Sequence, residues 1–170
     1  MAHTRTGAVL LALGIVPLVA VLAGCSKSPQ EQARNKLVGE MGVVWAPGNF
    51  LDAAKNGKQD VVGLFLQAGM DSETADDQGK TALILAAAEG HTATVKTLLA
   101  NGADAKNTDK QGKSALIWAA ERDHIPAVQA LLVNGADANH AANDGTTALA
   151  AAKTKGDAEL VALLEKAGAK

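Results

Sequence analysis

The stretch that decides the fold is residues 76–108, which read DDQGKTALILAAAEGHTATVKTLLANGADAKNT. A variant of the same stretch follows directly at residues 109–141, as DKQGKSALIWAAERDHIPAVQALLVNGADANHA. Within the first stretch, Thr81 is a suitable N-cap for a short helix over 82–89, and Gly90 interrupts the chain. A second helix is expected over 92–101, closed by Gly102 in a left-handed conformation. Each unit is therefore predicted to be a turn, two helices and a loop.

The spacing of 33 residues extends beyond these two stretches. At this offset five columns align: Gly79, Gly112 and Gly145; Val62, Val95, Val128 and Val161; Gly69, Gly102, Gly135 and Gly168; Asp71, Asp104 and Asp137; and Phe50, Leu83, Leu116 and Leu149. Agreement in so many columns indicates a tandem repeat. A unit of this size cannot bury its apolar face alone, so its stability has to come from stacking on its neighbours.

Composition excludes several classes of protein. The chain has 170 residues, of which 48% are hydrophobic, 2% aromatic and 20% charged, so it suits one domain and is not a disordered chain. The formal net charge of −2 argues against nucleic-acid binding, which needs a basic face. A single cysteine excludes an internal disulfide framework and any multi-cysteine metal site.

The repeated residues resemble the ankyrin repeat. The resemblance is carried by Asp76-x-x-Gly79-x-Thr81-Ala-Leu83, by its copy that begins at Asp109, and by the Gly-Ala-Asp segments at 102–104 and 135–137. It implies an all-α solenoid of about four helix-turn-helix units with short turn hairpins and a leading N-terminal helix. The implied repeats are residues 43–75, 76–108, 109–141 and 142–170, within a repeat domain over 43–170.

The chain departs from the family pattern at two kinds of position. The Pro-Leu-His of the typical repeat is replaced, for example by Ala82-Leu83-Ile84, so the hydrogen bonds of the motif histidine between repeats are expected to be missing. Aliphatic packing is expected to substitute for them. Asp123 stands where the family has glycine, and we expect it to adopt a strained left-handed conformation.

The first 24 residues have the features of a secretory signal. Arg5 precedes an uncharged stretch from Gly7 to Gly24, and small residues come before the only cysteine, in Leu22-Ala23-Gly24-Cys25. This resembles a bacterial lipoprotein signal, which implies cleavage before Cys25 and attachment of palmitate and other acyl chains to that residue. Ser26 is not the aspartate associated with inner-membrane retention, so the resemblance favours the outer membrane, facing the periplasm. The alternative is an uncleaved membrane helix, against which Pro17 and Gly14 weigh.

Residues 25–42 are expected to form a tether and a helix. Ser28 is a suitable N-cap with Pro29 at the first helical position, and Gly42 ends the segment. Four apolar residues at helical spacing predict a face that packs on the repeats as a lid: Ala33, Leu37, Val38 and Met41.

Motifs that suggest a ligand have simpler explanations. Gly79-Lys80-Thr81 looks like the end of a phosphate-binding loop, but Thr74 stands where that loop needs glycine, so we expect no nucleotide binding. Asp137-Ala138-Asn139 looks like the start of a calcium loop, but Ala141 and Ala142 occupy a ligand position and the turn glycine. The segment Glu121 to His124 is read as an exposed helix end.

Metal and catalytic sites are not expected either. His91 and His124 are one period apart, yet no third ligand is in step with them, so we expect structural roles and no metal. No nucleophile stands with a base, which predicts no catalytic residues, no cofactor and no enzyme activity. Trp118 is predicted to pack in the core, and Trp45 to cover the open end of the first unit.

The resemblance also implies a partner surface on the turn tips and the solvent side of the first helices. Carried onto this chain, it comprises Asp77, Gln78, Lys80, Glu89, Lys110, Gln111, Lys113, Glu121, Arg122, Asn143, Asp144, Thr146 and Lys153. Lys110, Lys113 and Arg122 are all predicted to be exposed.

The expected function is a monomeric, membrane-tethered binding module for an unidentified envelope protein. By resemblance to envelope ankyrin proteins, it would be an accessory to a stress-response enzyme such as catalase, or an immunity protein against a toxin. The alternative is a structural envelope component without a single partner, and an enzyme is the least favoured class.

Overall fold

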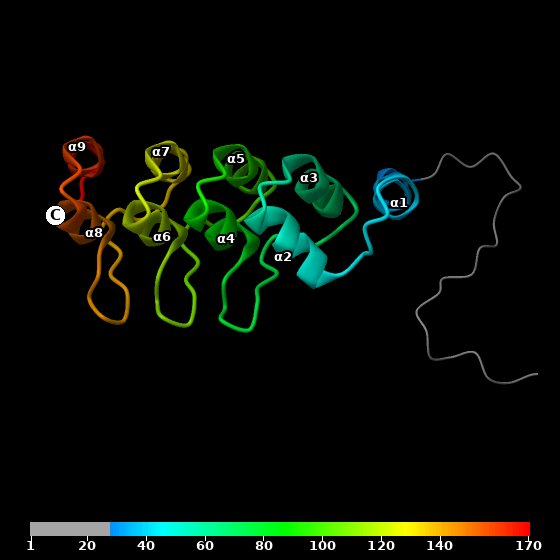
Figure 1. The fold of residues 1–170 in the computed structure, drawn as a ribbon, viewed down its shortest axis with the longest axis horizontal. Coiled ribbons are helices and arrows are strands. Elements are labelled where there is room, and N and C mark those ends of the chain that lie inside the picture. Colours follow the sequence, from blue (N-terminus) through cyan, green and yellow to red (C-terminus); the bar gives the residue numbers. More distant parts are fainter. Residues whose placement is uncertain (1–27) are drawn as a thin grey trace, which may run out of the picture.

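The computed structural model describes residues 28–170, and the predicted signal peptide and Cys25 lie outside this range. The described chain is a row of helix pairs in two layers, with α2, α4, α6 and α8 in one layer and α3, α5, α7 and α9 in the other (Figure 1). The elements are α1 (Pro29–Asn35), a π-helical turn (Lys36–Glu40), α2 (Pro47–Lys55), α3 (Gln59–Gln67), α4 (Ala82–Ala88), α5 (Thr92–Ala100), α6 (Ala115–Glu121), α7 (Ile125–Val133), α8 (Ala148–Lys155) and α9 (Ala158–Lys166). The predicted all-α solenoid with a leading helix is confirmed.

Hairpin loops project from the α4, α6 and α8 layer (Figure 1). Each is closed by one antiparallel bridge, at Ala75–Thr81, Thr108–Ser114 and Ala141–Thr147. The second residue of each bridge is also the N-cap of the helix that follows. The hydroxyl of Thr81, for example, accepts a hydrogen bond from the backbone N–H of Ile84 at 3.3 Å. One hydroxyl residue therefore sets both the end of the hairpin and the start of the helix.

The aligned apolar columns form the core. Phe50, Leu83, Leu116 and Leu149 are buried, as are Leu98 and Leu131 on the second helices. The valine column is buried in the first three units, but Val161 on α9 is only half-buried. No further helix pair follows α9 within the described chain to cover it (Figure 1). Leu160 and Leu164 on the same helix are fully buried, so the partial exposure of Val161 is confined to the outer side of α9.

Histidines connect successive repeats. His91 Nε2 donates to the carbonyl oxygen of Lys55 at 3.0 Å, and His124 Nε2 donates to that of Ala88 at 3.1 Å. His140 Nε2 lies 2.7 Å from the carbonyl oxygen of Gly112 in the preceding hairpin. Ile84 and Ile117, which stand in place of the motif histidine, are buried, as the expected aliphatic packing requires. Hydrogen bonds between repeats come instead from His91 and His124, which confirms their expected structural roles.

The loops before α7 and α9 differ in one backbone residue. Asp123, with φ of 66°, is the one non-glycine residue with positive φ among residues 28–170, which confirms its predicted left-handed conformation. When protonated, its carboxyl can donate a hydrogen bond to the carboxylate of Asp157, the N-cap of α9, and this raises the pKa of Asp123 above its usual value. The pKa of Asp157 is lowered, mainly because its carboxylate accepts a hydrogen bond from the N–H of Leu160.

The N-terminal segment packs on the first repeat as a lid. Its helix starts at Pro29 with Ser28 as N-cap, as predicted. Ser28 also forms a capping box with Glu31. Arg34 Nε donates to the carbonyl oxygen of Ala68 at 3.1 Å, and its guanidinium lies 4.8 Å from the ring centre of Trp45. Trp45 in turn packs on Phe65 with ring centres 5.3 Å apart. Trp45 therefore covers the open end of the repeats, as predicted.

The predicted apolar face of this segment is only half right. Ala33 and Leu37 are buried, but the side chains of Val38 and Met41 are 54% and 41% exposed. The physical reason is that the segment packs chiefly against a single helix, α3, which covers only a narrow stripe of it. Between residues 28 and 170, the helices are too short or too polar to cross a membrane.

Candidate protein-binding face

The hairpin tips form a continuous, internally bonded ledge. The carboxylates of Asp76 and Asp109 each accept two backbone N–H groups of their own turn. The N–H of Lys110 donates to Gln78 O at 2.9 Å, and that of Asn143 donates to Gln111 O at 3.0 Å. These bonds tie each tip to the next. The ledge is therefore a preorganised surface and not a set of independent loops.

The third tip lies close against the second. A Cβ placed on Gly112 would come within 2.5 Å of Asn143 Oδ1, so only glycine fits this approach. The N–H of Thr146 donates to Asp144 Oδ1 at 2.9 Å, which lowers the pKa of that carboxyl below its usual value. Between these two tips is an open hollow of about 520 Å³, lined by Lys110, Gln111, Lys113, Asn143 and Asp144.

Trp118 lies at the centre of this face, where it packs against the edge of the core and is not enclosed in it, so its predicted place in the core is only half right. The indole is half-buried, and its Nε1–H donates to Asp109 Oδ2 at 2.8 Å. Three cations lie over the ring, with Lys80 Nζ at 4.0 Å, Lys113 Nζ at 4.9 Å and Arg122 Cζ at 5.6 Å from its centre. The buried carboxylate of Asp109 needs donors, and an indole N–H usually finds an acceptor. This pairing holds the ring on the hairpin side.

Two of the three cations are already paired within the chain. Lys113 Nζ lies 2.5 Å from Glu121 Oε1, and Arg122 Nη1 lies 2.9 Å from Glu89 Oε1. The side chain of Lys113 is only 15% exposed, so the prediction that it is exposed is wrong. Within residues 28–170, Lys80 forms no ion pair with a carboxylate. Lys80 and the exposed Lys110 are therefore the cations of this face with charge available to a partner.

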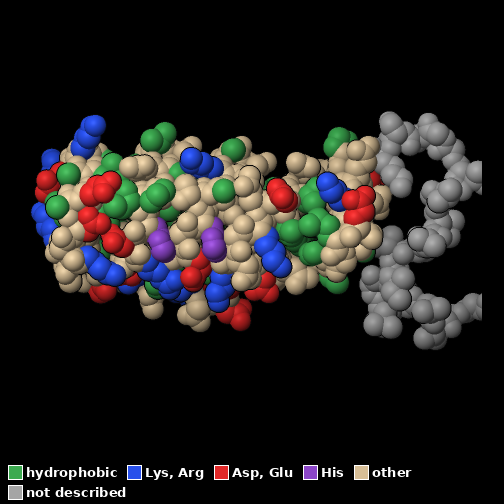
Figure 2. All heavy atoms as spheres, turned by 45° about the horizontal axis from the view of Figure 1, so that its top comes forward, with side chains coloured by type: hydrophobic (Ala, Val, Ile, Leu, Met, Phe, Trp, Pro, Cys, Tyr) green, Lys and Arg blue, Asp and Glu red, His purple; other side chains and the backbone are tan. Residues whose placement is uncertain are grey.

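The predicted partner residues all remain accessible to some degree. Nine are exposed: Asp77, Gln78, Glu89, Lys110, Gln111, Arg122, Asn143, Asp144 and Lys153. Four are half-buried: Lys80, Lys113, Glu121 and Thr146. They lie on the hairpin tips and along α4, α6 and α8 or at the ends of these helices. Basic and acidic side chains are intermixed along the edge that carries the hairpins (Figure 2).

Sequence reasoning missed two residues of this face, Trp118 and Asp109. The positions in step with Trp118 are Leu85 and Ala151, so its column reads as apolar. The charged residues could have indicated this cluster, because Lys80 and Lys113 are one period apart, as are Glu89 and Arg122. A period of 33 places such pairs on neighbouring repeats, around the residue between them.

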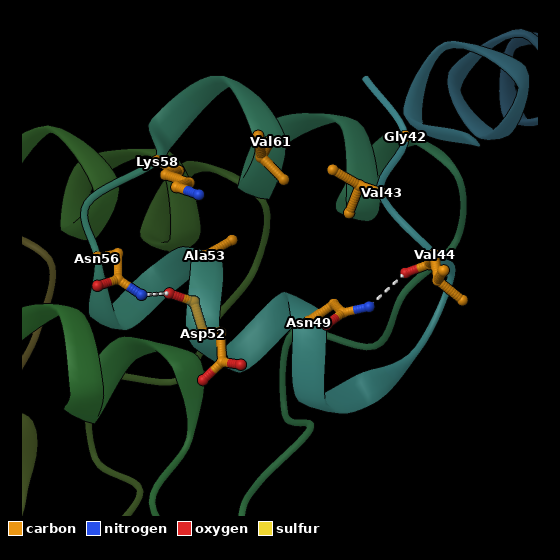
Figure 3. Close-up of a pocket in the computed structure, with 9 residues that line it drawn as sticks. All are labelled: Gly42, Val43, Val44, Asn49, Asp52, Ala53, Asn56, Lys58 and Val61. Carbon is orange, nitrogen blue, oxygen red and sulfur yellow. Dashed lines mark hydrogen bonds between the residues drawn. The ribbon is translucent and has the colours of Figure 1, made fainter. Parts of the chain in front are cut away.

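A second hollow, of about 520 Å³, lies at the other end of the array, between the segment 42–44, α2 and the start of α3 (Figure 3). Its amides are engaged with the backbone. Asn49 Nδ2 donates to Val44 O at 2.9 Å, and Asn56 Nδ2 donates to Asp52 O at 2.7 Å. Among residues 28–170, no group of three or more His, Cys, Asp or Glu residues is placed to hold a metal ion. Within the described residues, this hollow therefore shows no metal-binding group, and its two amides are already bonded.

The family model described as "Ankyrin repeats (3 copies)" matches residues 50–109 and 93–170, which is more than half of the chain. The chain therefore belongs to the ankyrin-repeat family. The search of curated proteins gave no match. Ankyrin repeats are generally non-enzymatic modules for protein–protein interaction, so the class of ligand is a protein.

Proposed function

We propose that this chain is a lipid-anchored ankyrin-repeat protein of the bacterial cell envelope, which binds one envelope protein through its hairpin-side face. The observation that carries the choice of face is the cluster around Trp118. A large aromatic ring, a buried carboxylate and three cations are held there by bonds within the chain. Because these side chains are already ordered, less conformational entropy is lost on binding than would be lost from a mobile surface.

Charge is expected to guide the partner to this face. The hairpin tips carry side chains of both charges. Lys80 and Lys110, which form no ion pair within the described residues, lie on the same tips as carboxylates such as Asp77 or on a neighbouring tip to Asp144. Such mixed surfaces contribute orientation and association rate more than raw affinity. The expected partner surface is therefore also mixed, with carboxylates that meet Lys80 and Lys110.

The proposed anchor is Cys25. Its support is the sequence Leu22-Ala23-Gly24-Cys25 after an uncharged stretch, at the only cysteine of the chain. Several acyl chains on one residue would give stable anchoring, whereas one chain alone binds a membrane reversibly. Ser26 favours the outer membrane with the repeats in the periplasm. Labelled palmitate should enter the wild type and not Cys25→Ser, and equal labelling of the two would contradict the anchor.

The binding face is tested by matched charge reversals. Lys80→Glu with Lys110→Glu changes the face, and Lys96→Glu with Lys166→Glu makes the same change of charge on α5 and α9, where both lysines are exposed. Affinity capture from envelope extracts, with the full chain in detergent, should lose the partner for the first pair and keep it for the second. Circular dichroism checks that both variants are folded. Equal capture by the two pairs would contradict the assignment of the face.

Two versions of the role predict different observations. An immunity protein would bind a toxin tightly and one to one, and its gene would lie beside the toxin gene. An accessory to an oxidative-stress enzyme would leave a peroxide-sensitive strain when deleted. A structural envelope component would instead be abundant and retain no single partner in the capture experiment.

A further inference from the structure

Exposed apolar side chains gather at the N-terminal end of the array. Among residues 28–170, the large hydrophobic residues with high exposure are Val38 at 54%, Met41 at 41%, Val44 at 64% and Val133 at 86%. Three of these four lie within seven residues of one another, in the connection between α1 and α2, and we call them the N-terminal apolar patch. Hydrophobic side chains are visible together at this end of the molecule (Figure 2). Single exposed apolar residues are ordinary, but a cluster marks an interaction surface.

The fold holds this patch in place without using it. The side of the segment that faces α3 is filled by Ala33 and Leu37, which are buried. The N–H of Val43 donates to Leu37 O at 2.8 Å, which fixes the turn after the helix. The Val44 side chain points away from the neighbouring hollow (Figure 3). The patch is therefore a presented surface and not part of the core.

The proposed lipid anchor, Cys25, is close in the sequence to this end of the array. Cys25 precedes Pro29 by four residues, and four residues span at most about 14 Å even when fully extended. An acylated Cys25 would thus hold the start of α1 within about 14 Å of the lipid. Residues 29–40 add about 18 Å if measured as a straight α-helix, so the patch stays within reach of the same surface. The C-terminus lies at the opposite end of the row (Figure 1).

We infer that the N-terminal apolar patch rests on the membrane surface, with Val38, Met41 and Val44 in the interface beside the lipid anchor. This inference rests on the proposed acylation of Cys25. The anchor confines the patch near the bilayer, so even a weak contact is favoured by the high local concentration. The charged neighbours Arg34, Lys36, Glu31 and Glu40 balance in sign, so the contact is apolar and should not require anionic lipid.

The contact would orient the array. With its N-terminal end on the membrane, the row of repeats would extend away from the lipid, and the hairpins, which project sideways from the row, would open along the membrane plane (Figure 1). The Trp118 face would then be free to meet a partner in the space beside the membrane.

The two tryptophans allow a direct test. Trp45 adjoins the patch and Trp118 lies in the middle of the array, so Trp118→Phe leaves one reporter at the end and Trp45→Phe leaves one in the middle. The full chain would be produced in a bacterial host, its acylation measured by intact mass, and the protein reconstituted in phosphatidylcholine vesicles with brominated acyl chains. An apolar surface seated at the headgroup boundary lies within quenching range, so Trp45 fluorescence should fall at least about twofold while Trp118 fluorescence stays constant.

Variants of the patch complete the test. Val38→Ser, Met41→Ser and Val44→Ser together should abolish the quenching of Trp45, whereas Val133→Ser should leave it unchanged. An acylated protein whose Trp45 is quenched no more than Trp118 would overturn the contact and leave the anchor standing. A mass without acyl chains would overturn both. A dimer in detergent that the triple variant dissociates would also overturn the inference, because the patch would then be an interface between two copies.

Discussion

The first two junctions between repeats and the last junction are bridged by different residues in the loops before the second helices. In the first two, Gly57 faces His91 and Gly90 faces His124, and each imidazole reaches a carbonyl of the preceding repeat. In the last, Asp123 and Asp157 occupy the positions of this glycine and histidine. A Cβ on Gly57 or Gly90 would come within 2.6 Å of the facing ring, so glycine is needed there. The shorter Asp157 leaves room for the side chain of Asp123.

The last junction retains other connections. Asn139 Nδ2 donates to Gly168 O at 3.0 Å, and the N–H of Lys170 donates to Asn139 Oδ1 at 3.0 Å. The hairpin bond from Asn143 to Gln111 also crosses it. What the junctions share is therefore a polar link over an apolar stack, and the residue that provides the link can vary. The apolar stack should dominate stability at every junction.

The largest effect is expected from the apolar stack. Leu131 on α7 is fully buried, and Leu131→Ala should lower the free energy of unfolding by about 2–5 kcal/mol through lost burial and a cavity. Val133→Ala on the same helix is the control, because Val133 is exposed and its truncation should cost almost nothing. Urea unfolding followed by circular dichroism measures both. Similar losses for the two variants would contradict the assigned core.

The next effect separates the histidine bridge from backbone strain. Gly90 and Gly156 have nearly equal φ values of 74° and 75°, but only Gly90 has an imidazole against it. Gly156→Ala should therefore cost about 1–2 kcal/mol from the left-handed backbone alone. Gly90→Ala should cost about 1 kcal/mol more, because His124 is displaced from Ala88 O. The extra cost should vanish in the background of His124→Ala, and its persistence there would contradict the bridge.

A smaller effect on the free energy of unfolding, of opposite sign, is expected at Thr94 on α5. The hydroxyl of Thr94 is buried on α5 and has no hydrogen-bond partner among residues 28–170. Thr94→Val keeps the shape and removes the unpaired hydroxyl, so it should stabilise the fold by about 1 kcal/mol. Thermal unfolding provides the measurement. A loss of stability would show that the hydroxyl is bonded in solution.

The smallest effect concerns the last junction and depends on pH. The hydrogen bond to Asp157 raises the pKa of Asp123 in the folded state, so the contribution of Asp123 is present at low pH and is lost as the pH rises through that raised value. Asp123→Asn removes this titration and suits the left-handed backbone better. The variant should therefore gain on the wild type as the pH rises from about 3 to 6. Urea midpoints that differ by a constant amount across this range would contradict the coupling.

Features that depend on residues of a single repeat could be predicted from the sequence. The helix boundaries, the Thr81 cap and the apolar columns follow from local pattern, and the structure has them with one exception, Val161, which is only half-buried. The errors concern residues whose surroundings come from other units. Val38 is exposed because a single helix packs on its segment. Trp118 is only half-buried at the edge of the core because a buried carboxylate of the hairpin accepts its N–H. His140 bonds to Gly112 only through the placing of the hairpins, which no local pattern describes.

The central claim is that the partner lies on the hairpin side, around Trp118. The most direct measurement is amide hydrogen exchange of the full chain with and without the captured partner. The claim predicts slower exchange in residues 76–82, 109–115 and 142–148 and in α4, α6 and α8. Protection confined to α5, α7 and α9, with the hairpins unchanged, would contradict it.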